Sequence, residues 1–400
     1  MMNEKFLLWD NPKQAVWHTM FALLFVGCIN IFSASFIRAE ADGSSTFYYL
    51  IRYIVYSAIG LLAIGIARTF NYRRLLSKNA ISFIYFSILV MLILVDFIGL
   101  ESGGARRWLG FGGVTVQPSE FAKLGIIMVC ARYLGMHLKK GKYASVLEGD
   151  GRMCLAATGV YAFLVQQQPD MGTAAIIVAL MFCMYIIAGL PWMQIGSVCV
   201  LGASVAAFLV MTSTYRADRI RVWLDPWIDE VGDGYQMVQS LLSIGSGGWN
   251  GTKWGEGSSK FFYLPEAHTD FAFAVFCQEN GFVGACFLIS LFAILGCALL
   301  RIAVCSKDER GFLLAAGVSF LIVGQAAANM AMVCGLLPVI GVPLVFISYG
   351  GSSLIISMAA IGLALSVYDD EVEREKAAAL AEPEERRSDL RVVSRRWHPH

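Results

Sequence analysis

The sequence has few charged residues for its length. Asp, Glu, Lys and Arg make up 15% of its 400 residues, whereas about a quarter is usual in a soluble globular protein. Hydrophobic residues make up 57%, which is typical of a chain that crosses a membrane several times. The net charge of only +1 excludes the large basic surface that nucleic-acid binding requires.

The sequence also lacks the patterns of several common sites. Nine of its 10 cysteines lie in apolar stretches and no CxxC pair is present, so the thiols are expected to be packing groups and we predict neither a disulfide nor a zinc site. No glycine-rich segment is followed by GK[ST], which excludes a Walker phosphate loop. No internal repeat is evident, which weakens the case for a transporter built from inverted repeats.

What the sequence does contain is ten apolar stretches, each close to the length of about 20 residues that a transmembrane helix needs. They lie near residues 15–37, 47–69, 80–100, 118–137, 152–168, 171–190, 194–212, 271–300, 311–334 and 345–367. Between the fifth and the sixth, Pro169 is expected to end the first helix. We therefore predict an all-α polytopic membrane protein with a ten-helix domain over residues 15–367.

Basic residues predict the orientation of this domain. Counted with the adjoining span ends, 21 Lys and Arg residues fall on the side of both termini and nine on the other side. By the positive-inside rule, residues 1–14 and the tail 368–400 are cytoplasmic. The tail is expected to form a short helix with a disordered end. Residues 213–270, between the seventh and eighth spans, then form an extracytoplasmic loop long enough to suggest a function.

Charged residues gather where the fourth span begins. Arg106, Arg107 and Trp108 precede it, and this combination suits either an anionic headgroup or a plain interfacial anchor. Glu120 and Lys123 follow at the i, i+3 spacing that places both on one helical face. A charge within a span costs about 2.5 to 3.5 kcal/mol on insertion scales. The pair therefore either serves a site or locks helices together.

The long loop carries two further groups. Arg216 and Arg219 share a face if the loop begins as a helix, and they could bind a pyrophosphate or simply lipid headgroups. Glu266, His268 and Asp270 lie within five residues just before the eighth span. Desolvation and neighbouring negative charge raise the pKa of a carboxyl group toward the range of a general base. The alternative role for Asp270 is the N-cap of the eighth span.

The last two spans carry uncharged polar groups. Gln325 and Asn329 are one helical turn apart in the ninth span, and such amides are more often contacts between helices than ligands. A Ser- and Gly-rich segment, residues 348–353, leads into the tenth span. Its small residues permit close helix packing, or expose backbone N–H groups to an anion.

These motifs, in this order, resemble the SEDS family (shape, elongation, division and sporulation) of cell-wall polymerases. The matching stretches are GARRW and QPSEFAK (residues 104–123), QQPDMGTA (167–174), YRADRIRVWLDP (215–226), GYQMVQSLLSIGSGGW (234–249), KFFYLPEAHTDFAFAV (260–275) and GLLPVIGVPLVFISYGGSSL (335–354). The YLPEAHTDF and GSGGW stretches resemble the division (FtsW) branch more than the elongation (RodA) branch. The chain departs from the family pattern at Gln278, usually a carboxylate, and at Val345, usually a proline.

The resemblance implies a glycosyltransferase of the cytoplasmic membrane that polymerises lipid II into glycan strands on the outer face at the division septum. It also implies a class B penicillin-binding protein and other division proteins as partners. The family's essential aspartate falls on Asp270, its span-four pair on Glu120 and Lys123, and its Arg-Trp pair on Arg107 and Trp108.

The expected reaction is an inverting single displacement. Asp270 takes the proton from the 4-hydroxyl of the acceptor N-acetylglucosamine, which attacks C1 of the donor N-acetylmuramic acid. Arg107, Arg216 and Arg219, with a divalent cation such as Mg or Mn, neutralise the leaving undecaprenyl pyrophosphate. Glu120 and Lys123 line the intramembrane side of the cavity, and the substrate site is completed by Trp108, Glu266 and His268. No metal ligands are assigned. A lipid II flippase, the elongation polymerase of the same family and a noncatalytic division scaffold are the alternatives.

Overall fold

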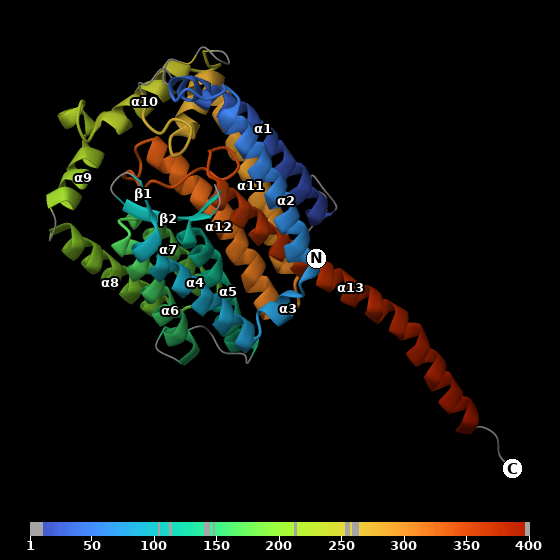
Figure 1. Ribbon diagram of the computed structural model, residues 1–400. Helices are drawn as coiled ribbons and strands as arrows, with labels where there is room; N and C mark the ends of the chain where they lie inside the picture. The colour runs from blue at the N-terminus through green and yellow to red at the C-terminus, as the bar shows by residue number, and fades with distance from the viewer. Residues whose placement is uncertain are drawn as a thin grey trace.

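The computed structural model describes residues 11–102, 105–111, 114–139, 145–146, 149–211, 214–252, 257 and 264–396. Helices dominate this part of the chain (Figure 1). They are α1 (Pro12–Ala41), α2 (Tyr48–Thr69), α3 (Tyr72–Leu75), α4 (Lys78–Ile98), α5 (Pro118–Lys139), α6 (Gly149–Gln167), α7 (Met171–Ile187), α8 (Trp192–Met211), α9 (Thr214–Leu224), the 3-10 helix η2 (Pro226–Asp229), α10 (Tyr235–Gly247), α11 (Ala272–Cys305), α12 (Glu309–Val333) and α13 (Gly351–Arg396).

A helix lies over each of the ten stretches that the sequence predicts to cross a membrane. Among the described residues, seven helical segments are long and apolar enough to do so: α1, α2, α4, α5, α11, α12 and the first 28 residues of α13. Helix α7 and the start of α8 are apolar but shorter. The chain is therefore a multi-pass membrane protein, as predicted.

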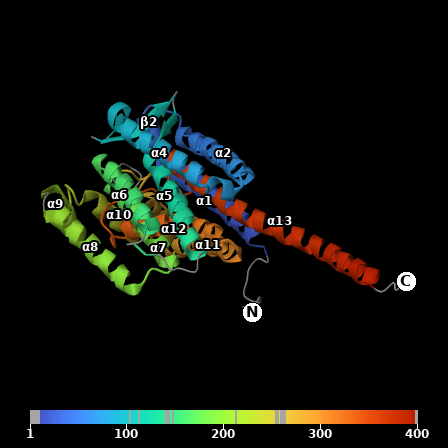
Figure 2. The same cartoon turned by 90° about the horizontal axis from the view of Figure 1, so that it is seen from below.

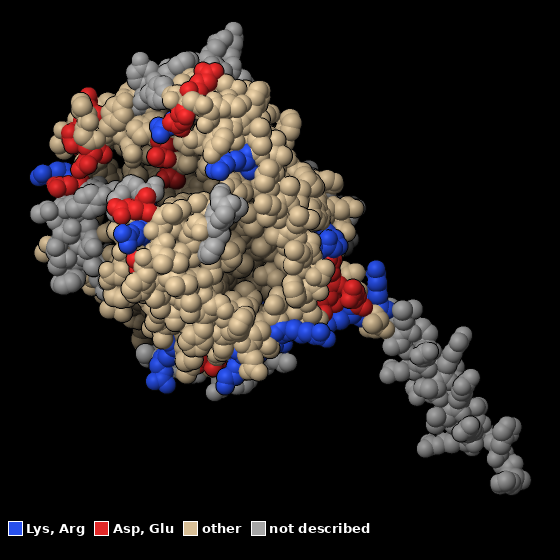
Figure 3. All heavy atoms as spheres, viewed as in Figure 1, with Lys and Arg blue, Asp and Glu red and all other residues tan. Residues whose placement is uncertain are grey.

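The surface of the bundle has the polarity expected of a protein in lipid. Large apolar side chains point outward from three helices, with Leu62 on α2, Phe25 on α1 and Phe83 on α4 all more than half exposed. Charged side chains gather toward the two ends, and the surface between them is mostly uncharged (Figure 3). An apolar surface of this kind is stable in contact with lipid hydrocarbon, whereas placing a charged side chain there costs free energy.

The helices pack in an order that differs from their order in the chain. Helix α13 lies along α2, α1 lies against α11, and α12 contacts both α5 and α11. Small residues permit the closest approach: a Cβ at Gly362 would lie 2.8 Å from the carbonyl oxygen of Ile64. Figure 2 shows this packing from below, with α6, α7 and α8 grouped on the opposite side from α13.

The break between α6 and α7 is where the sequence predicts it. Helix α6 ends at Gln167, and α7 begins at Met171. Asp170 is the N-cap of α7, because its Oδ1 accepts a hydrogen bond from the backbone N–H of Thr173 at 3.1 Å. Pro169 cannot continue the α6 hydrogen-bond pattern, and Asp170 starts the next helix.

A small antiparallel sheet is the part of the fold that the all-α prediction misses. Strands β1 (Leu100–Ser102), β2 (Ala105–Phe111) and β3 (Val114–Val116) join α4 to α5 in the order β1-β2-β3. Leu109 pairs with Val116 across β2 and β3, and β2 contacts the ends of α4 and α5. The strands are too short to give a clear period-two pattern, so no strand was predicted here.

The C-terminal tail also differs from its prediction. Helix α13 continues through the tail to Arg396, without the separate short helix that was expected, and it projects away from the bundle (Figure 1). The tail is rich in Ala, Glu and Arg, which are strong helix formers. Ion pairs hold the helix where it leaves the bundle, with Asp369 bonded to Lys13 and Arg68 at 2.6 Å each.

Candidate active site

A cavity of about 650 Å³ lies between α2, the small sheet, residues 266–270 and residues 341–353. We call it the main cavity. Four predicted site residues line it together: Arg107 and Trp108 from β2, and Glu266 and Asp270 from the segment before α11. The fold therefore joins two motifs that are far apart in the sequence.

The backbone at Asp270 is fixed by a buried amide. Asn329 on α12 donates through Nδ2 to the carbonyl oxygens of Asp270 and Val342, at 2.7 Å each. Gly341, next to Val342, has a φ of +62°, a conformation that favours glycine. A Cβ there would lie 3.6 Å from Oδ2 of Asp270. The predicted role of Asn329 as a contact between segments is confirmed, and that contact positions Asp270.

Asp270 is not the N-cap of α11, so that alternative is wrong. The N-cap is Phe271, and no side chain makes a capping hydrogen bond. Residues 265–271 form turns in which the backbone N–H of Phe271 bonds to the carbonyl oxygen of Glu266 at 3.2 Å. These turns direct the Asp270 carboxyl group to the main cavity, where it is available for chemistry.

The surroundings of Asp270 give its carboxyl group an unusual proton affinity. Burial, together with the nearby carboxylates of Glu266 and Asp170, raises the pKa of Asp270 to about 7, while the Arg107 guanidinium acts in the opposite direction. Protonated and deprotonated forms are therefore both well populated near neutral pH. This is the pKa range in which a general base works best.

Only one of the two adjacent arginines in β2 faces the main cavity. Arg107 donates from Nε to the carbonyl oxygen of Gln168 at 3.0 Å, and from Nη2 to that of Pro169. Arg106 is not among the residues that line the cavity and pairs with Glu101 at 3.5 Å. Arg107 thus presents a positive charge that is held by neutral carbonyl groups.

A second arginine in the main cavity was not predicted. Arg52 comes from α2, where its guanidinium carbon lies 4.8 Å from the ring centroid of Tyr48, and it hydrogen-bonds to the hydroxyl of Tyr349. The sequence held a signal for it, because a charge inside an apolar stretch is itself a reason to suspect a site. That reasoning identified Lys123 but was not applied to Arg52.

Glu120 and Lys123 lie behind the wall of the main cavity. They form a buried ion pair, 2.8 Å between Oε1 and Nζ, on one face of α5 as predicted. Lys123 also donates to Oε1 of Gln325 at 2.6 Å. Gln325 in turn donates to the carbonyl oxygen of Pro343 at 3.1 Å and to Oγ of Ser353 at 3.2 Å. The pair supports the cavity wall, and neither residue lines the cavity surface.

Asp170 is a further residue of the site that the sequence analysis missed. It is buried, and besides capping α7 it accepts a hydrogen bond from Nε2 of Gln117 at 3.2 Å. Burial raises the pKa of Asp170, and its charge acts on Asp270. The sequence signal for Asp170 is its place in the QQPDMGTA stretch, from which only the helix-ending role of Pro169 was predicted.

His268 does not line the main cavity. It borders a second cavity of about 310 Å³, together with Arg38, Tyr49 and Glu266, which we call the side cavity. Burial lowers the pKa of His268, so its imidazole is neutral at pH 7 and can both donate and accept a hydrogen bond. Glu266 borders both cavities.

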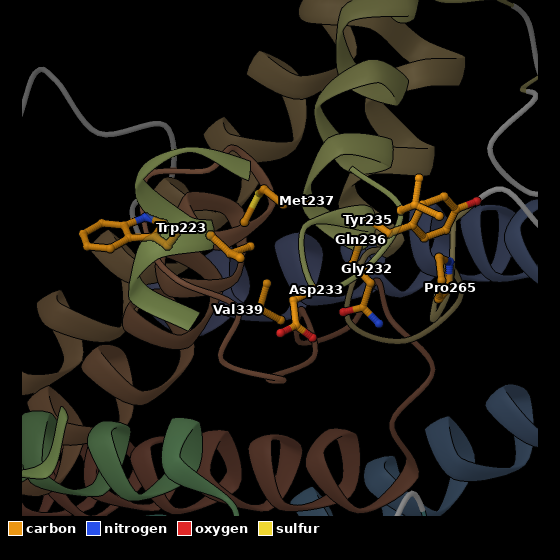
Figure 4. A pocket seen from close by; sticks show the side chains of 10 residues that line it. Trp223, Gly232, Asp233, Tyr235, Gln236, Met237, Pro265 and Val339 are labelled. Carbon is orange, nitrogen blue, oxygen red and sulfur yellow. The ribbon is translucent and has the colours of Figure 1, made fainter. Parts of the chain in front are cut away.

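A third cavity, also of about 310 Å³, lies between α9, residues 231–233 and the start of α10. Figure 4 shows Trp223 at the opposite side of this cavity from Tyr235 and Pro265. Trp223 holds α9 to the loop after α12, because its Nε1 donates to the carbonyl oxygen of Gly335 at 3.1 Å. Arg216 and Arg219 are in α9, as predicted for a helix, but their side chains lie outside the described part of the structure.

The described residues do not offer an evident metal site. No group of three or more His, Cys, Asp or Glu side chains is arranged to hold an ion in this part of the chain. A divalent cation needs several oxygen ligands from the protein, its substrate or water. The residues present therefore do not fit a resident metal, and we derive no step through one.

Comparison with known proteins identifies the family. The family model FTSW_RODA_SPOVE, described as "Cell cycle protein", matches residues 13–373. The chain belongs to this family. It is 37% identical to the "Probable peptidoglycan glycosyltransferase FtsW" of Geobacter sp. (strain M18), over 85% of this chain and 92% of that protein. It is also 34% identical to "Stage V sporulation protein E" of Bacillus subtilis (strain 168), over 86% and 93%.

Solved structures show the same fold. One similar chain comes from the work described as "Structural coordination of polymerization and crosslinking by a peptidoglycan synthase complex", with a TM-score of 0.75 and 27% identity over 92% of this chain and 99% of that one. The crystal structure of Thermus thermophilus rod shape determining protein RodA is similar with a TM-score of 0.66 and 27% identity, over 92% and 98%. The resemblance drawn from the sequence motifs is thus confirmed at the level of family and fold.

Proposed function

We propose that this protein is a peptidoglycan glycosyltransferase that polymerises lipid II into glycan strands during septal cell-wall synthesis. The observation that carries the proposal is Asp270, a carboxyl group with a pKa of about 7 in a cavity that also contains Arg52 and Arg107. The division branch is favoured because relatives named FtsW are 34 to 38% identical, whereas the RodA structures are 27% identical.

The proposed step is a single displacement with inversion at C1. The deprotonated Asp270 accepts the proton from the 4-hydroxyl of the acceptor N-acetylglucosamine. The bond from that oxygen to C1 of the donor N-acetylmuramic acid forms, and the bond from C1 to the phosphate oxygen breaks. Undecaprenyl pyrophosphate leaves with the electron pair. A base with a pKa near the working pH contributes about 10² to 10⁴ in rate.

Arg107 and Arg52 are the proposed partners of the leaving pyrophosphate. Planar guanidinium groups match phosphate oxygens in two-point contacts. Arg107 is held by backbone carbonyls and Arg52 by a hydroxyl, and among the described residues neither forms an ion pair that the substrate would have to break. We expect Arg216 and Arg219 on α9 to add charge as the glycan grows, and Trp108 to contact a sugar ring.

The remaining residues are proposed to support the base Asp270 and the wall of the main cavity. Glu266 and Asp170 keep the pKa of Asp270 high through their negative charge. Glu120 and Lys123, which were expected to contact substrate, act here by holding the wall formed by Pro343 and Ser353. A divalent cation brought by the pyrophosphate itself stays a proposal, and measuring polymerisation after chelation with EDTA checks it.

We also propose the membrane arrangement predicted from the sequence. Ten helices cross the cytoplasmic membrane, both termini are cytoplasmic, and residues 213–270 lie outside the membrane at the division septum. The main cavity is then at the outer surface. Attaching a membrane-impermeant thiol reagent to single cysteines introduced at Ser44, before α2, and at Ser77, before α4, checks this orientation.

The proposed partner is a class B penicillin-binding protein, which would cross-link the glycan that this chain makes. The support is the similar chain from a peptidoglycan synthase complex whose description couples polymerization with crosslinking. Other division proteins are expected to join the assembly. Copurification of the full-length chain with its penicillin-binding protein is the direct measurement.

The decisive experiment combines the purified protein, its partner and lipid II, and separates glycan strands on a gel. Asp270→Asn should abolish strands while the protein still binds its partner. Asp218→Asn, an exposed carboxylate on α9, is the matched control and should leave polymerisation unchanged. A wild-type rate for Asp270→Asn would overturn the assignment of the base. A flippase would instead move lipid II across a bilayer and make no glycan at all.

A further inference from the structure

The segment from Leu264 to Asp270 is a wall between two cavities. Its Glu266 and Asp270 line the main cavity, while His268, two residues from each of them, lines the side cavity. Glu266 borders both. A ligand in the side cavity would therefore lie across a single side chain from the proposed base.

Glu266 has a backbone conformation that is uncommon for its residue type. Its φ is +53°, which few residues other than glycine adopt. The conformation is held by Thr269, whose hydroxyl donates to Oε2 at 2.7 Å and whose backbone N–H bonds to the Glu266 carbonyl oxygen at 3.1 Å. Such conformations persist where the surrounding structure imposes them, often at ligand sites. Here the result is a carboxylate held at the boundary of the two cavities.

The side cavity has the chemistry of a sugar site. Tyr49 and His268 supply rings whose centroids are 4.8 Å apart, and apolar ring surface suits the C–H face of a sugar. Arg38 supplies N–H donors, Glu266 a carboxylate acceptor, and the neutral imidazole of His268 one donor and one acceptor. Its volume of about 310 Å³ is at the lower end of the range for small-molecule pockets, which is adequate for one sugar ring.

The same cavity is poorly suited to a phosphate. Nε of Arg38 is already paired with Oδ2 of Asp42 at 3.2 Å, and the Glu266 carboxylate would repel an anion. His268 adds no positive charge, because burial lowers its pKa. The main cavity differs, since Arg107 there bonds to neutral carbonyl groups. The two cavities thus favour different parts of a sugar pyrophosphate.

We propose that the side cavity binds the terminal N-acetylated amino sugar of the acceptor, while the main cavity holds the donor and its pyrophosphate. This inference rests on the proposed polymerase function. Glu266, which borders both cavities, would accept a hydrogen bond from the acceptor sugar at their boundary, so that the 4-hydroxyl edge of the sugar extends past this side chain into the main cavity and meets Asp270 there. Tyr49 and His268 are binding residues in this arrangement, and Glu266 is a positioning residue.

The first test measures sugar binding without catalysis. The probe is N,N′-diacetylchitobiose, added to the full-length Asp270→Asn protein in lipid nanodiscs and followed by saturation-transfer NMR. Tyr49→Ala should weaken binding about tenfold and His268→Gln should weaken it less, whereas Tyr49→Phe keeps the ring and should retain binding. Phe47→Ala is the matched control, because this exposed aromatic residue lines neither cavity.

The binding test can either support or overturn the side cavity as a sugar site. Loss of binding in Tyr49→Ala, with retention in Tyr49→Phe and Phe47→Ala, supports the side cavity as the sugar site. The proposal is overturned if the Asp270→Asn parent does not bind the probe, or if Tyr49→Ala and His268→Gln bind it as the parent does. Copurification of each variant with the penicillin-binding protein checks that it is folded.

The second test separates this proposal from the proposed function. In lipid II polymerisation, Tyr49→Ala should raise KM about tenfold with kcat within about twofold, which a general loss of structure would not do. If the wild type polymerises and Tyr49→Ala has an unchanged KM, the subsite is wrong and the polymerase assignment stands. If the wild type binds chitobiose through Tyr49 but makes no glycan, the polymerase assignment fails and the sugar site stands.

Discussion

The two ends of the bundle use charged residues in opposite ways. Where α13 leaves the bundle, carboxylates are matched by cations: Asp369 bonds to Lys13 and Arg68 at 2.6 Å each, and Asp370 bonds to Arg73 at 3.0 Å. In the main cavity the opposite holds for Asp270, whose carboxyl group has other carboxylates as neighbours and a pKa raised to about 7.

The difference separates charges that hold the fold from charges that are available for chemistry. A carboxylate with two cationic partners is a fixed part of the structure, because any change in its proton or its partner breaks contacts. Within the described part of the chain, neither Asp270 nor Arg107 forms an ion pair, so a substrate can supply their partners. The sequence shows the same residue types at both ends, and only their surroundings distinguish them.

The largest effect, on stability, is expected at the buried ion pair behind the main cavity, because we expect Glu120 and Lys123 to hold the fold together. Lys123→Met leaves Glu120 buried without its cation, and breaking such a pair costs about 3 to 5 kcal/mol. We expect a matching fall in unfolding free energy, measured by denaturant titration in detergent micelles. The double variant with Glu120→Gln should recover part of the loss. Equal stability of Lys123→Met and wild type would show that the pair is not structural.

A smaller effect, on activity alone, is expected at Arg107. Arg107→Gln removes a charge aimed at the leaving pyrophosphate, and loss of one such donor lowers kcat by about 10² to 10³. The matched change at the other end is Arg68→Gln, which should leave kcat unchanged. Steady-state polymerisation of lipid II by the three proteins measures both. Similar losses in the two variants would remove the distinction between the ends.

The pH dependence of activity sharpens the comparison further. Because the deprotonated form of Asp270 is the base, kcat/KM should rise with pH and level off above its pKa of about 7. Glu266→Gln removes a negative charge that raises this pKa, so its profile should move to lower pH. Asp370→Asn at the far end should leave the profile in place. A profile that does not move in Glu266→Gln would contradict the proposed coupling.

The smallest effect is expected where α13 leaves the bundle. Asp369→Asn weakens two partly exposed ion pairs, and exposed pairs contribute about 0 to 1 kcal/mol each. The unfolding temperature should fall slightly, and less so in high salt, because salt screens such pairs. Polymerisation should be unaffected. A loss of activity without a loss of stability would show that the ion pairs of Asp369 are needed for catalysis.

The parts of the fold that follow from local sequence were predictable. Helix positions follow from the length and polarity of each apolar stretch, and the end of α6 follows from Pro169, whose ring excludes a helical hydrogen bond. The i, i+3 spacing alone places Glu120 beside Lys123. The small sheet was missed because its strands of three to seven residues are too short for a periodic signal.

The candidate site was predictable only in part. Asp270 was recognisable from the carboxylates and histidine around it and from the family motif, but its alternative role as an N-cap was excluded only by the turns before α11. Arg52 carried only the general signal of a charge inside an apolar stretch, and its place in the main cavity became evident only from the fold. The separation of His268 from Asp270 into different cavities was also invisible, since two residues of spacing do not fix which side of a turn a side chain faces.

The sequence by itself determined that this protein is a multi-pass membrane protein, and it identified several of the polar residues of the site, Asp270 and Arg107 among them. Polarity, helix length and local caps act between near neighbours, so a sequence reports them directly. Only the tertiary structure decided which charges neutralise one another. Lys13 pairs with Asp369 across packed helices, whereas Asp270 shares a cavity with Arg107 without an ion pair between them, and the burial that raises the pKa of Asp270 exists only once these elements are assembled.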